Sequence, residues 1–165
     1  MAKKAPSAPA AQPAPKPYKG RSARTVAQYD AYIAILHAAE TFQRQATELL
    51  RESELSLAQY NVLRILRGAG APGLACGEVA GRLIRHDPDM TRLLDRLEKR
   101  HLTERTREPH DRRVVLTRIT PQGLALLATL DEPIDALHER QLGHLSAERL
   151  GELTRVLHEA RDRPA

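Results

Sequence analysis

Residues 90–123 read MTRLLDRLEKRHLTERTREPHDRRVVLTRITPQG, and the periodicity of this stretch changes partway along it. Its first part has apolar residues three and four positions apart, which predicts an amphipathic helix. These residues are Met90, Leu93, Leu94 and Leu97. Its second part has two strand-like runs, 103–107 and 114–120, separated by the polar residues 108–112, which predicts a β-hairpin. The stretch therefore predicts a helix followed directly by a hairpin.

The predicted helix carries polar and charged residues opposite its leucines. We expect Asp87 to cap its first amides and Pro88 to lie in its first turn, where no amide hydrogen is needed. The outward residues are Asp89, Thr91, Arg92, Arg96 and Lys99. The arginines either contact a partner outside the helix or pair with Asp89 and Asp95 on a solvated face, an interaction worth about 0.3–0.5 kcal/mol per pair. The residues alone leave both interpretations open.

Helical patterns flank this stretch on both sides. We expect a first helix at about 25–51, a second from the capping box Ser56-Leu57-Ala58-Gln59 to Gly68, and a third from Cys76 or Gly77 to Ile84. After the hairpin, two further helices are expected to begin at caps formed by Thr120 and Ser146. The predicted fold class is mainly α with a small β-hairpin, in which a helix-turn-helix pair precedes the hairpin.

The composition limits the class of protein. The chain has 165 residues, no Trp and a single cysteine, Cys76, so it cannot form an internal disulfide. It has no apolar run long enough to cross a bilayer and nothing that resembles a secretory signal. We expect a cytoplasmic protein with an aliphatic core and no membrane partner.

Positive charge is concentrated in two parts of the chain. Residues 1–25 carry six basic and no acidic residues, and residues 82–118 carry eleven basic against seven acidic residues. We expect residues 1–22 to form a disordered basic tail rich in Ala, Pro and Lys. The central block suits a polyanionic partner, although a solvated surface without a partner explains the same counts equally well.

The order of the predicted elements and the sequence of residues 90–123 resemble those of the MarR (multiple antibiotic resistance regulator) family of bacterial winged-helix transcription regulators. The similarity lies in the T-R-L-x-D-R-L-E-x-x-x-L helix from Thr91, in the D-R-R run at Asp111 and in the L-T-x-x-G-like start of the next helix. It extends over about residues 25–162. The resemblance implies a winged helix-turn-helix protein that binds double-stranded DNA. The expected role of such a protein is that of a repressor.

The family resemblance also implies roles for individual residues. Arg113 resembles the wing arginine that enters the minor groove, and Asp111 the carboxylate that braces it. The expected DNA-binding residues are Pro88, Asp89, Thr91, Arg92, Arg96, Arg112 and Arg113. Without the resemblance, Arg113 has a second interpretation as a charge that protects an edge strand from aggregation. The chain departs from the family at Asp87-Pro88-Asp89, where small or basic residues are common, and at His101, where glycine is common.

The resemblance implies a homodimer that binds a pseudo-palindromic operator. In such a dimer, residues 23–55 and 121–162 would form the dimerisation helices and residues 56–120 the winged helix-turn-helix. A small aromatic or phenolic effector would release the DNA. The aromatic and histidine residues expected near its pocket are Tyr29, Tyr32, His37, Phe42 and Tyr60. Ordinary core packing is the alternative for these residues, and Cys76 is either an inert apolar residue or an oxidant sensor.

Two further patterns bear on enzymatic activity. Residues 68–73, GAGAPG, match a dinucleotide-binding motif in letters, but they follow a helix and Pro72 lacks an amide donor, so we expect a loop. The histidines show no metal-ligand spacing and no nucleophile stands with a base. We expect neither an enzyme nor a cofactor nor a metal. A winged-helix module that binds protein and not DNA is the alternative function.

Overall fold

The computed structural model describes residue 20 and residues 22–84, 88–107 and 113–162. The chain divides into two units, residues 1–39 and residues 40–165. The predicted tail, residues 1–22, lies outside the described residues except at Gly20 and Ser22. The first unit is described mainly as the beginning of α1 (Ala23–Leu50), which confirms the long N-terminal helix.

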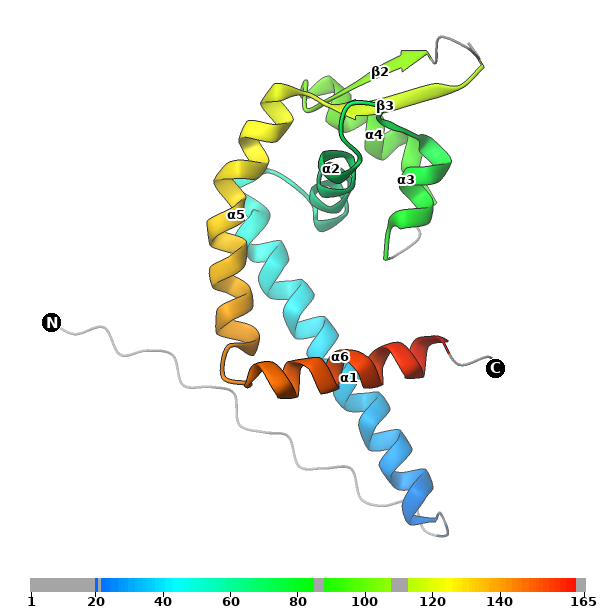
Figure 1. Cartoon of the computed structure of the whole chain (residues 1–165), viewed down its shortest axis with the longest axis vertical. Helices are drawn as coiled ribbons and strands as arrows, with labels where there is room; N and C mark the ends of the chain where they lie inside the picture. Colours follow the sequence, from blue (N-terminus) through cyan, green and yellow to red (C-terminus); the bar gives the residue numbers. More distant parts are fainter. Residues whose placement is uncertain (1–19, 21, 85–87, 108–112, 163–165) are drawn as a thin grey trace, which may run out of the picture. The chain divides into compact units, whose positions relative to one another are not determined.

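The second unit contains the end of α1 and every later element (Figure 1). In chain order these are the 3-10 turn η1 (Arg51–Ser53), α2 (Leu57–Ala69), β1 (Leu74–Ala75), α3 (Cys76–Arg82), α4 (Met90–Lys99), β2 (Thr103–Arg107), β3 (Val115–Ile119), α5 (Pro121–Leu142) and α6 (Ala147–Asp162). The predicted fold class, mainly α with a β-hairpin wing, is confirmed.

The predicted starts of α2 and α5 are confirmed by their capping bonds. Ser56 Oγ accepts a hydrogen bond from the Gln59 amide at 3.2 Å, and Gln59 Oε1 accepts one from the Ser56 amide at 2.9 Å. Thr120 Oγ1 accepts one from the Gly123 amide at 3.1 Å. Each cap satisfies backbone donors that the first helical turn leaves without partners.

The predicted start of α4 is wrong. The helix begins at Met90, whereas Pro88 and Asp89 lie in a preceding turn and Asp87 is outside the described residues. Asp89 occupies the N-cap position with φ −117° and ψ 41°, so its carboxylate makes no capping bond. It pairs instead with Arg92, whose Nη1 lies 3.3 Å from Asp89 Oδ2.

Two helix ends also differ from the prediction by short distances. α2 continues to Ala69 and ends against Gly70, which has φ 70°. α3 stops at Arg82 and not at Ile84, because Leu83 adopts an extended backbone with ψ 139°. Ile84 is consequently 94% exposed. Local apolar spacing therefore predicted these helices but not their last turns.

The sheet has three antiparallel strands in the order β1-β3-β2. The predicted hairpin is confirmed as β2 paired with β3, with Arg105 opposite Thr117. The strand β1, which was not predicted, pairs Leu74 with Thr117 and Ala75 with Leu116. The strand is only two residues long, and this length is too short to show an alternating pattern.

The turn from α4 into β2 passes through His101, which has φ 57°. This left-handed conformation is the one that favours glycine, as expected from the family pattern at this position. The His101 carbonyl oxygen accepts a hydrogen bond from Thr120 Oγ1 at 2.6 Å. The turn is thereby fixed to the start of α5.

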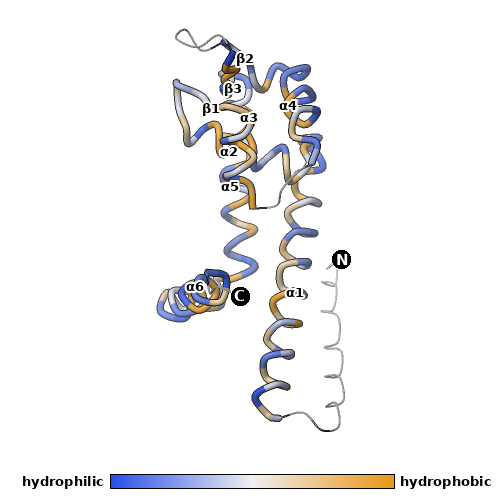
Figure 2. Tube along the Cα trace, turned by 90° about the vertical axis from the view of Figure 1, so that its right-hand side faces the viewer, coloured by the Kyte–Doolittle hydropathy of each residue, from blue (hydrophilic) through white to orange (hydrophobic). Residues whose placement is uncertain are grey.

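An aliphatic core joins α2, α4 and the sheet to α5. Its fully buried residues include Val62, Leu63 and Leu66 of α2, Leu94 and Leu97 of α4, and Leu127 of α5. In contrast, α6 has no buried residue, and hydrophobic and hydrophilic residues are interleaved along it (Figure 2). Of the helices that the structure describes, none combines the length and apolar character that a membrane span requires.

Candidate nucleic-acid interface

The leucines of α4 turn its polar face outward. Met90, Leu93, Leu94 and Leu97 are at most 6% exposed and hold the helix against the core. The residues expected to contact DNA lie on the other side, where Thr91, Arg92 and Arg96 are exposed, and in the turn before it, where Pro88 is exposed and Asp89 is partly buried. The helix thus presents two arginines one turn apart.

The acidic residues of α4 are paired differently from the sequence expectation. Arg92 does pair with Asp89, but the two side chains are 76% and 47% exposed, so water screens the pair strongly. Asp95 pairs with Arg105 of β2 at 2.7 Å and not with the arginines of its own helix. The expectation that an arginine of α4 pairs with Asp95 is therefore wrong, because Arg105 of β2 binds that carboxylate.

The wing places Arg113 at the far end of the hairpin. The paired part of the hairpin ends at Arg107 opposite Val115, and Arg113 lies two residues before Val115 in an exposed turn. Arg112 and the expected brace Asp111 lie outside the described residues. Of the residues of the predicted DNA site, the structure thus describes Pro88 and Asp89, the residues of α4 and one wing arginine.

Two arginines outside the predicted site, Arg100 and Arg105, hold this region together. Arg105 contacts α4 from β2, as described above. Arg100, at the end of α4, donates from Nη1 to the Glu54 carbonyl at 2.7 Å and from Nη2 to the Ser53 carbonyl at 3.0 Å. The contacts of Arg100 have no local sequence signal, because its partners lie 46 and 47 residues away, and those of Arg105 cross from a strand to a helix.

A bidentate ion pair joins α2 to α5. Arg67 Nη1 lies 3.0 and 2.9 Å from the two carboxylate oxygens of Asp131, and Nη2 lies 3.0 Å from Oδ1. These hydrogen bonds lower the pKa of Asp131 and raise that of Arg67. The geometry matches the planar fork with which arginine recognises a carboxylate, so the pair links α2 to α5 at the surface.

A cavity of about 470 Å³ lies between the end of α1, α2 and α5. Its apolar wall includes Phe42, Leu57, Tyr60 and Ile134, and its polar groups include Asn61, Arg64, His138 and Gln141. The structure thus brings together Phe42 and Tyr60 of the five residues expected near an effector. Tyr29, Tyr32 and His37 belong to the first unit, in which Tyr32 is 58% exposed.

Tyr60 is the most buried aromatic wall of this cavity, at 4% exposure. Burial raises the pKa of its hydroxyl, which the positive charge of Arg64 partly offsets. The Arg64 guanidinium carbon lies 5.7 Å from the centre of the Tyr60 ring. Tyr60 therefore remains a neutral group near pH 7, beside the exposed cation of Arg64, which also lines the cavity.

Two other kinds of site were considered in the sequence, a metal site and a reactive cysteine. In the residues that the structure describes, no three histidine, cysteine or acidic side chains gather where they could hold a metal ion. Cys76 is partly buried at the start of α3. The arrangement that remains is an arginine-bearing helix beside a hairpin with an arginine at its end, which is the architecture of a winged helix-turn-helix protein.

The chain belongs to the MarR family. The MarR family model matches residues 55–115, the segment from the start of α2 to the wing. A MarR transcription factor from Planctomyces limnophilus, known from its crystal structure, is 44% identical, with a TM-score of 0.62 over 79% of this chain and 94% of that chain.

Two other relatives carry names that describe their function. The homoprotocatechuate degradative operon repressor of Escherichia coli is 27% identical over 127 residues, 77% of this chain and 84% of the repressor. A mutant MarR from E. coli, solved in complex with operator DNA, is 26% identical with a TM-score of 0.70, covering 77% of this chain and 90% of that one. These relatives are transcription regulators and not enzymes.

Proposed function

We propose that this chain is a cytoplasmic transcription regulator that binds a pseudo-palindromic DNA operator as a homodimer and is released by a small effector. The observation that carries the proposal is the outward arginine face of α4 beside a hairpin that ends at Arg113. A relative with the same fold was solved on operator DNA. The expected DNA-binding residues remain Pro88, Asp89, Thr91, Arg92, Arg96, Arg112 and Arg113.

The two elements contact DNA by different physical means. An arginine of α4 can donate two hydrogen bonds to guanine O6 and N7, which discriminates against a wrong base by about 1–3 kcal/mol. An arginine of the wing is attracted by the negative potential of a narrow A·T-rich minor groove. Because both arrive with positive charge, they displace counterions from the phosphates, and the binding weakens steeply with salt.

Titration of random duplex DNA at low and high salt tests the proposal. Salt-dependent binding supports a DNA regulator. A protein that shows no binding even at low salt would favour the alternative, a winged-helix module that binds another protein, because counterion release affects any duplex regardless of sequence.

Arg113→Ala is expected to weaken binding to an operator by roughly tenfold, the loss of one arginine contact to DNA. The reason is its position in the exposed turn at the end of the wing. The measurement is fluorescence anisotropy with a labelled duplex, with the dimer and the melting temperature checked in parallel. Arg161→Ala, which removes an exposed cation at the end of α6, is the control. Equal affinity for wild type and Arg113→Ala would remove the wing from the mechanism.

The dimer is proposed from the uncovered apolar surface of α6. Leu153, Val156 and Leu157 are 41%, 46% and 37% exposed and recur on one side of the helix. A 16-residue helix without buried residues is marginal by itself in water. On α1 of the first unit, Ile35 and Leu36 are also 46% and 48% exposed. We infer that a second copy covers these residues, which agrees with dimerisation helices at 23–55 and 121–162.

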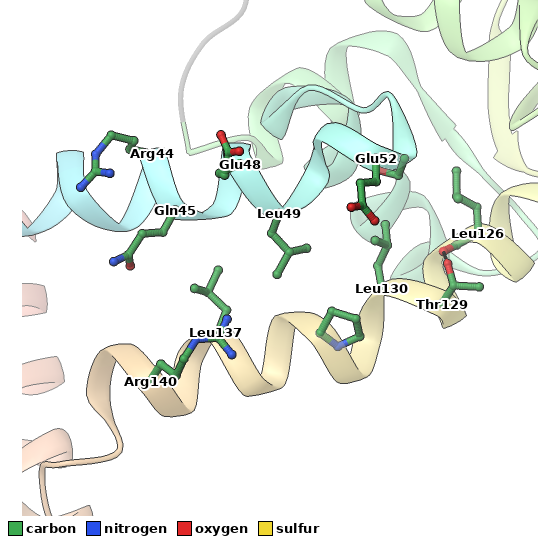
Figure 3. Close-up of a pocket in the computed structure, with 12 residues that line it drawn as sticks. Arg44, Gln45, Glu48, Leu49, Glu52, Leu126, Thr129, Leu130, Leu137 and Arg140 are labelled. Carbon is green, nitrogen blue, oxygen red and sulfur yellow. Dashed lines mark hydrogen bonds between the residues drawn. The ribbon is translucent and has the colours of Figure 1, made fainter. Parts of the chain in front are cut away.

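A groove between α1 and α5 offers a matching surface (Figure 3). Its volume is about 900 Å³, and Leu49, Leu130 and Leu137 point into it from the two helices. Charges of both signs line its edges: Arg44, Glu48, Glu52 and Arg140. The occupant we propose is α6 of a second copy, whose apolar stripe is likewise flanked by charges of both signs, including Arg149 and Glu152.

The effector site is proposed at the cavity of Phe42 and Tyr60. The cavity combines an apolar wall with a few polar groups, the usual pattern of a small-molecule site. Because it touches α1, α2 and α5, a bound molecule contacts both the winged helix-turn-helix and a helix that leaves it. A small aromatic or phenolic compound would shift the population of conformers if it bound the two arrangements with different affinities.

Benzoate and phenol are suitable probes for this cavity. We expect at least one of them to raise the melting temperature, since a ligand at about a hundred times its Kd stabilises the folded state by about 2.7 kcal/mol. Phe42→Ala should reduce this shift because it removes an aromatic wall, whereas Tyr32→Ala removes an exposed tyrosine of the first unit and should not. Equal shifts in wild type and Phe42→Ala would place the effector elsewhere.

A further inference from the structure

Arg105 makes the most connected charged contact between α4 and the sheet among the described residues. Its Nη1 lies 2.7 Å from Asp95 Oδ1 and 3.5 Å from Glu98 Oε2, and its Nη2 donates to the Thr91 carbonyl oxygen at 3.4 Å. The side chain is 26% exposed. Residues 91, 95 and 98 span about two turns of one helix face. A single guanidinium therefore fixes β2 along two turns of α4.

The position of Arg105 in the sheet lets this contact affect the direction of the wing hairpin. Arg105 is opposite Thr117 of β3, and Thr117 is in turn opposite Leu74 of β1. At this level the sheet has three strands. Beyond it, at Arg107 opposite Val115, only the two strands of the hairpin remain paired. Because a two-stranded ribbon is marginally stable by itself, its direction depends on how its three-stranded base is attached.

Arg105 also controls charge on the DNA-facing helix. Asp95 and Glu98 are 41% and 39% exposed, and two carboxylates on this helix would repel DNA phosphates. Asp95 is three residues from Arg92 and could pair with it along the helix. Arg105 holds both carboxylates from the strand side, so the arginines of α4 stay turned outward.

We propose that Arg105 is a positioning residue that sets the angle between α4 and the wing, so that both elements reach one duplex together. This inference rests on the proposed DNA binding. Sequence discrimination requires helix and wing contacts to form simultaneously, and preorganised geometry supplies this. Charge neutralisation alone would affect all duplexes equally. Loss of Arg105 should therefore reduce discrimination in addition to general affinity.

The test compares four proteins, and a fifth as a reference, on two duplexes. One duplex is the tightest sequence that the wild type selects from a random pool, and the other is a random duplex of the same length. The proteins are wild type, Arg105→Gln, the triple variant Arg105→Gln/Asp95→Asn/Glu98→Gln, and Arg107→Gln. The last removes an exposed cation from the same strand and serves as the matched control. Arg96→Ala gives the reference for a lost base contact.

Arg105→Gln should bind the random duplex more weakly and lower the ratio of the two affinities by about fivefold or more, the size of one lost base contact. The triple variant should regain affinity for the random duplex, because the uncovered carboxylates are gone, while the ratio stays low. Arg107→Gln should keep the ratio. A ratio that recovers in the triple variant, or that never falls in Arg105→Gln, would reduce Arg105 to a counter-charge and overturn the proposal.

A measurement without DNA separates this inference from the proposed function. Amide hydrogen exchange of Val115–Ile119 should accelerate in Arg105→Gln and in the triple variant, and stay at the wild-type rate in Arg107→Gln. Unchanged exchange in all variants overturns the positioning role, whatever the DNA result. A wild type that binds no duplex, with accelerated exchange in Arg105→Gln, refutes the proposed function and leaves the link between α4 and the wing standing.

Should Arg105→Gln fail to fold, Arg105→Lys keeps the positive charge but has a single ammonium in place of the planar fork. It should bind the random duplex as wild type does and still lose discrimination. Wild-type discrimination in Arg105→Lys would show that charge alone is sufficient, and would overturn the proposal.

Discussion

Leu153→Asp/Leu157→Asp will convert the protein from dimer to monomer and abolish tight operator binding. Both leucines lie on the exposed apolar stripe of α6, which has no buried residue within its own chain. Within a subunit contact, an uncompensated carboxylate costs several kcal/mol, and two of them face each proposed partner surface. Light scattering after size-exclusion chromatography measures the mass, and anisotropy measures the affinity for the selected duplex.

The expected loss of DNA affinity follows from linked binding. A dimer binds its second half-site as an intramolecular step, which raises the overall affinity by roughly 10²–10⁴ over one subunit. The monomer should lose that factor while its winged helix-turn-helix stays folded. A monomer that binds the operator as tightly as wild type would show that one subunit is sufficient, and a variant that remains dimeric would exclude this stripe of α6 from the interface.

The control for this experiment lies on the same helix. Thr154→Asp/His158→Asp places two aspartates with the same spacing on a neighbouring polar side of α6. Both original residues are exposed, and the Thr154 hydroxyl donates to the Leu150 carbonyl four residues earlier. The control should remain dimeric. A monomeric control would mean that the added charge, and not the stripe, disrupts assembly.

The parts of the fold that were predictable are those encoded by neighbours in sequence. The leucines of α4 recur every three or four residues, and the caps at Ser56 and Thr120 bond within three residues, so both are visible in a short window. The left-handed turn at His101 was anticipated only through the family resemblance. Composition alone would not have indicated it.

The parts that were missed depend on contacts between distant residues. The strand β1 exists because Leu74 and Ala75 meet β3, and two residues carry no periodic signal. Asp95 looked like a partner for its helical neighbours, yet the strand residue Arg105 takes it. The start of α4 was misplaced because Asp87-Pro88 is a typical capping sequence, whereas the helix begins only at Met90, after a turn at Pro88 and Asp89. Tertiary contacts overrode the local pattern at β1 and Asp95, and the turn at Pro88 and Asp89 did so at the start of α4.

Gly123→Ala will destabilise the fold although alanine is the better helix former. Gly123 lies in the first turn of α5, where a Cβ would clash with the Leu102 carbonyl oxygen and stand 2.8 Å from Ile119 Cγ1. That carbonyl cannot simply withdraw, because it accepts a hydrogen bond from the Thr120 amide at 3.1 Å. Alanine gains about 1 kcal/mol of helix propensity, whereas overpacking of this kind costs about 1–3 kcal/mol or more.

Gly151→Ala is the matched control, since Gly151 lies within α6 and a Cβ there meets nothing within 4 Å. It should raise the melting temperature slightly, while Gly123→Ala lowers it by about 2–4 °C for each kcal/mol lost in a chain of this size. Thermal unfolding followed by circular dichroism measures both. Because α5 can relieve the clash only by moving away from the turn before β2, Gly123→Ala should also weaken DNA binding. Equal melting temperatures for Gly123→Ala and Gly151→Ala would show that α5 does not approach Leu102 this closely.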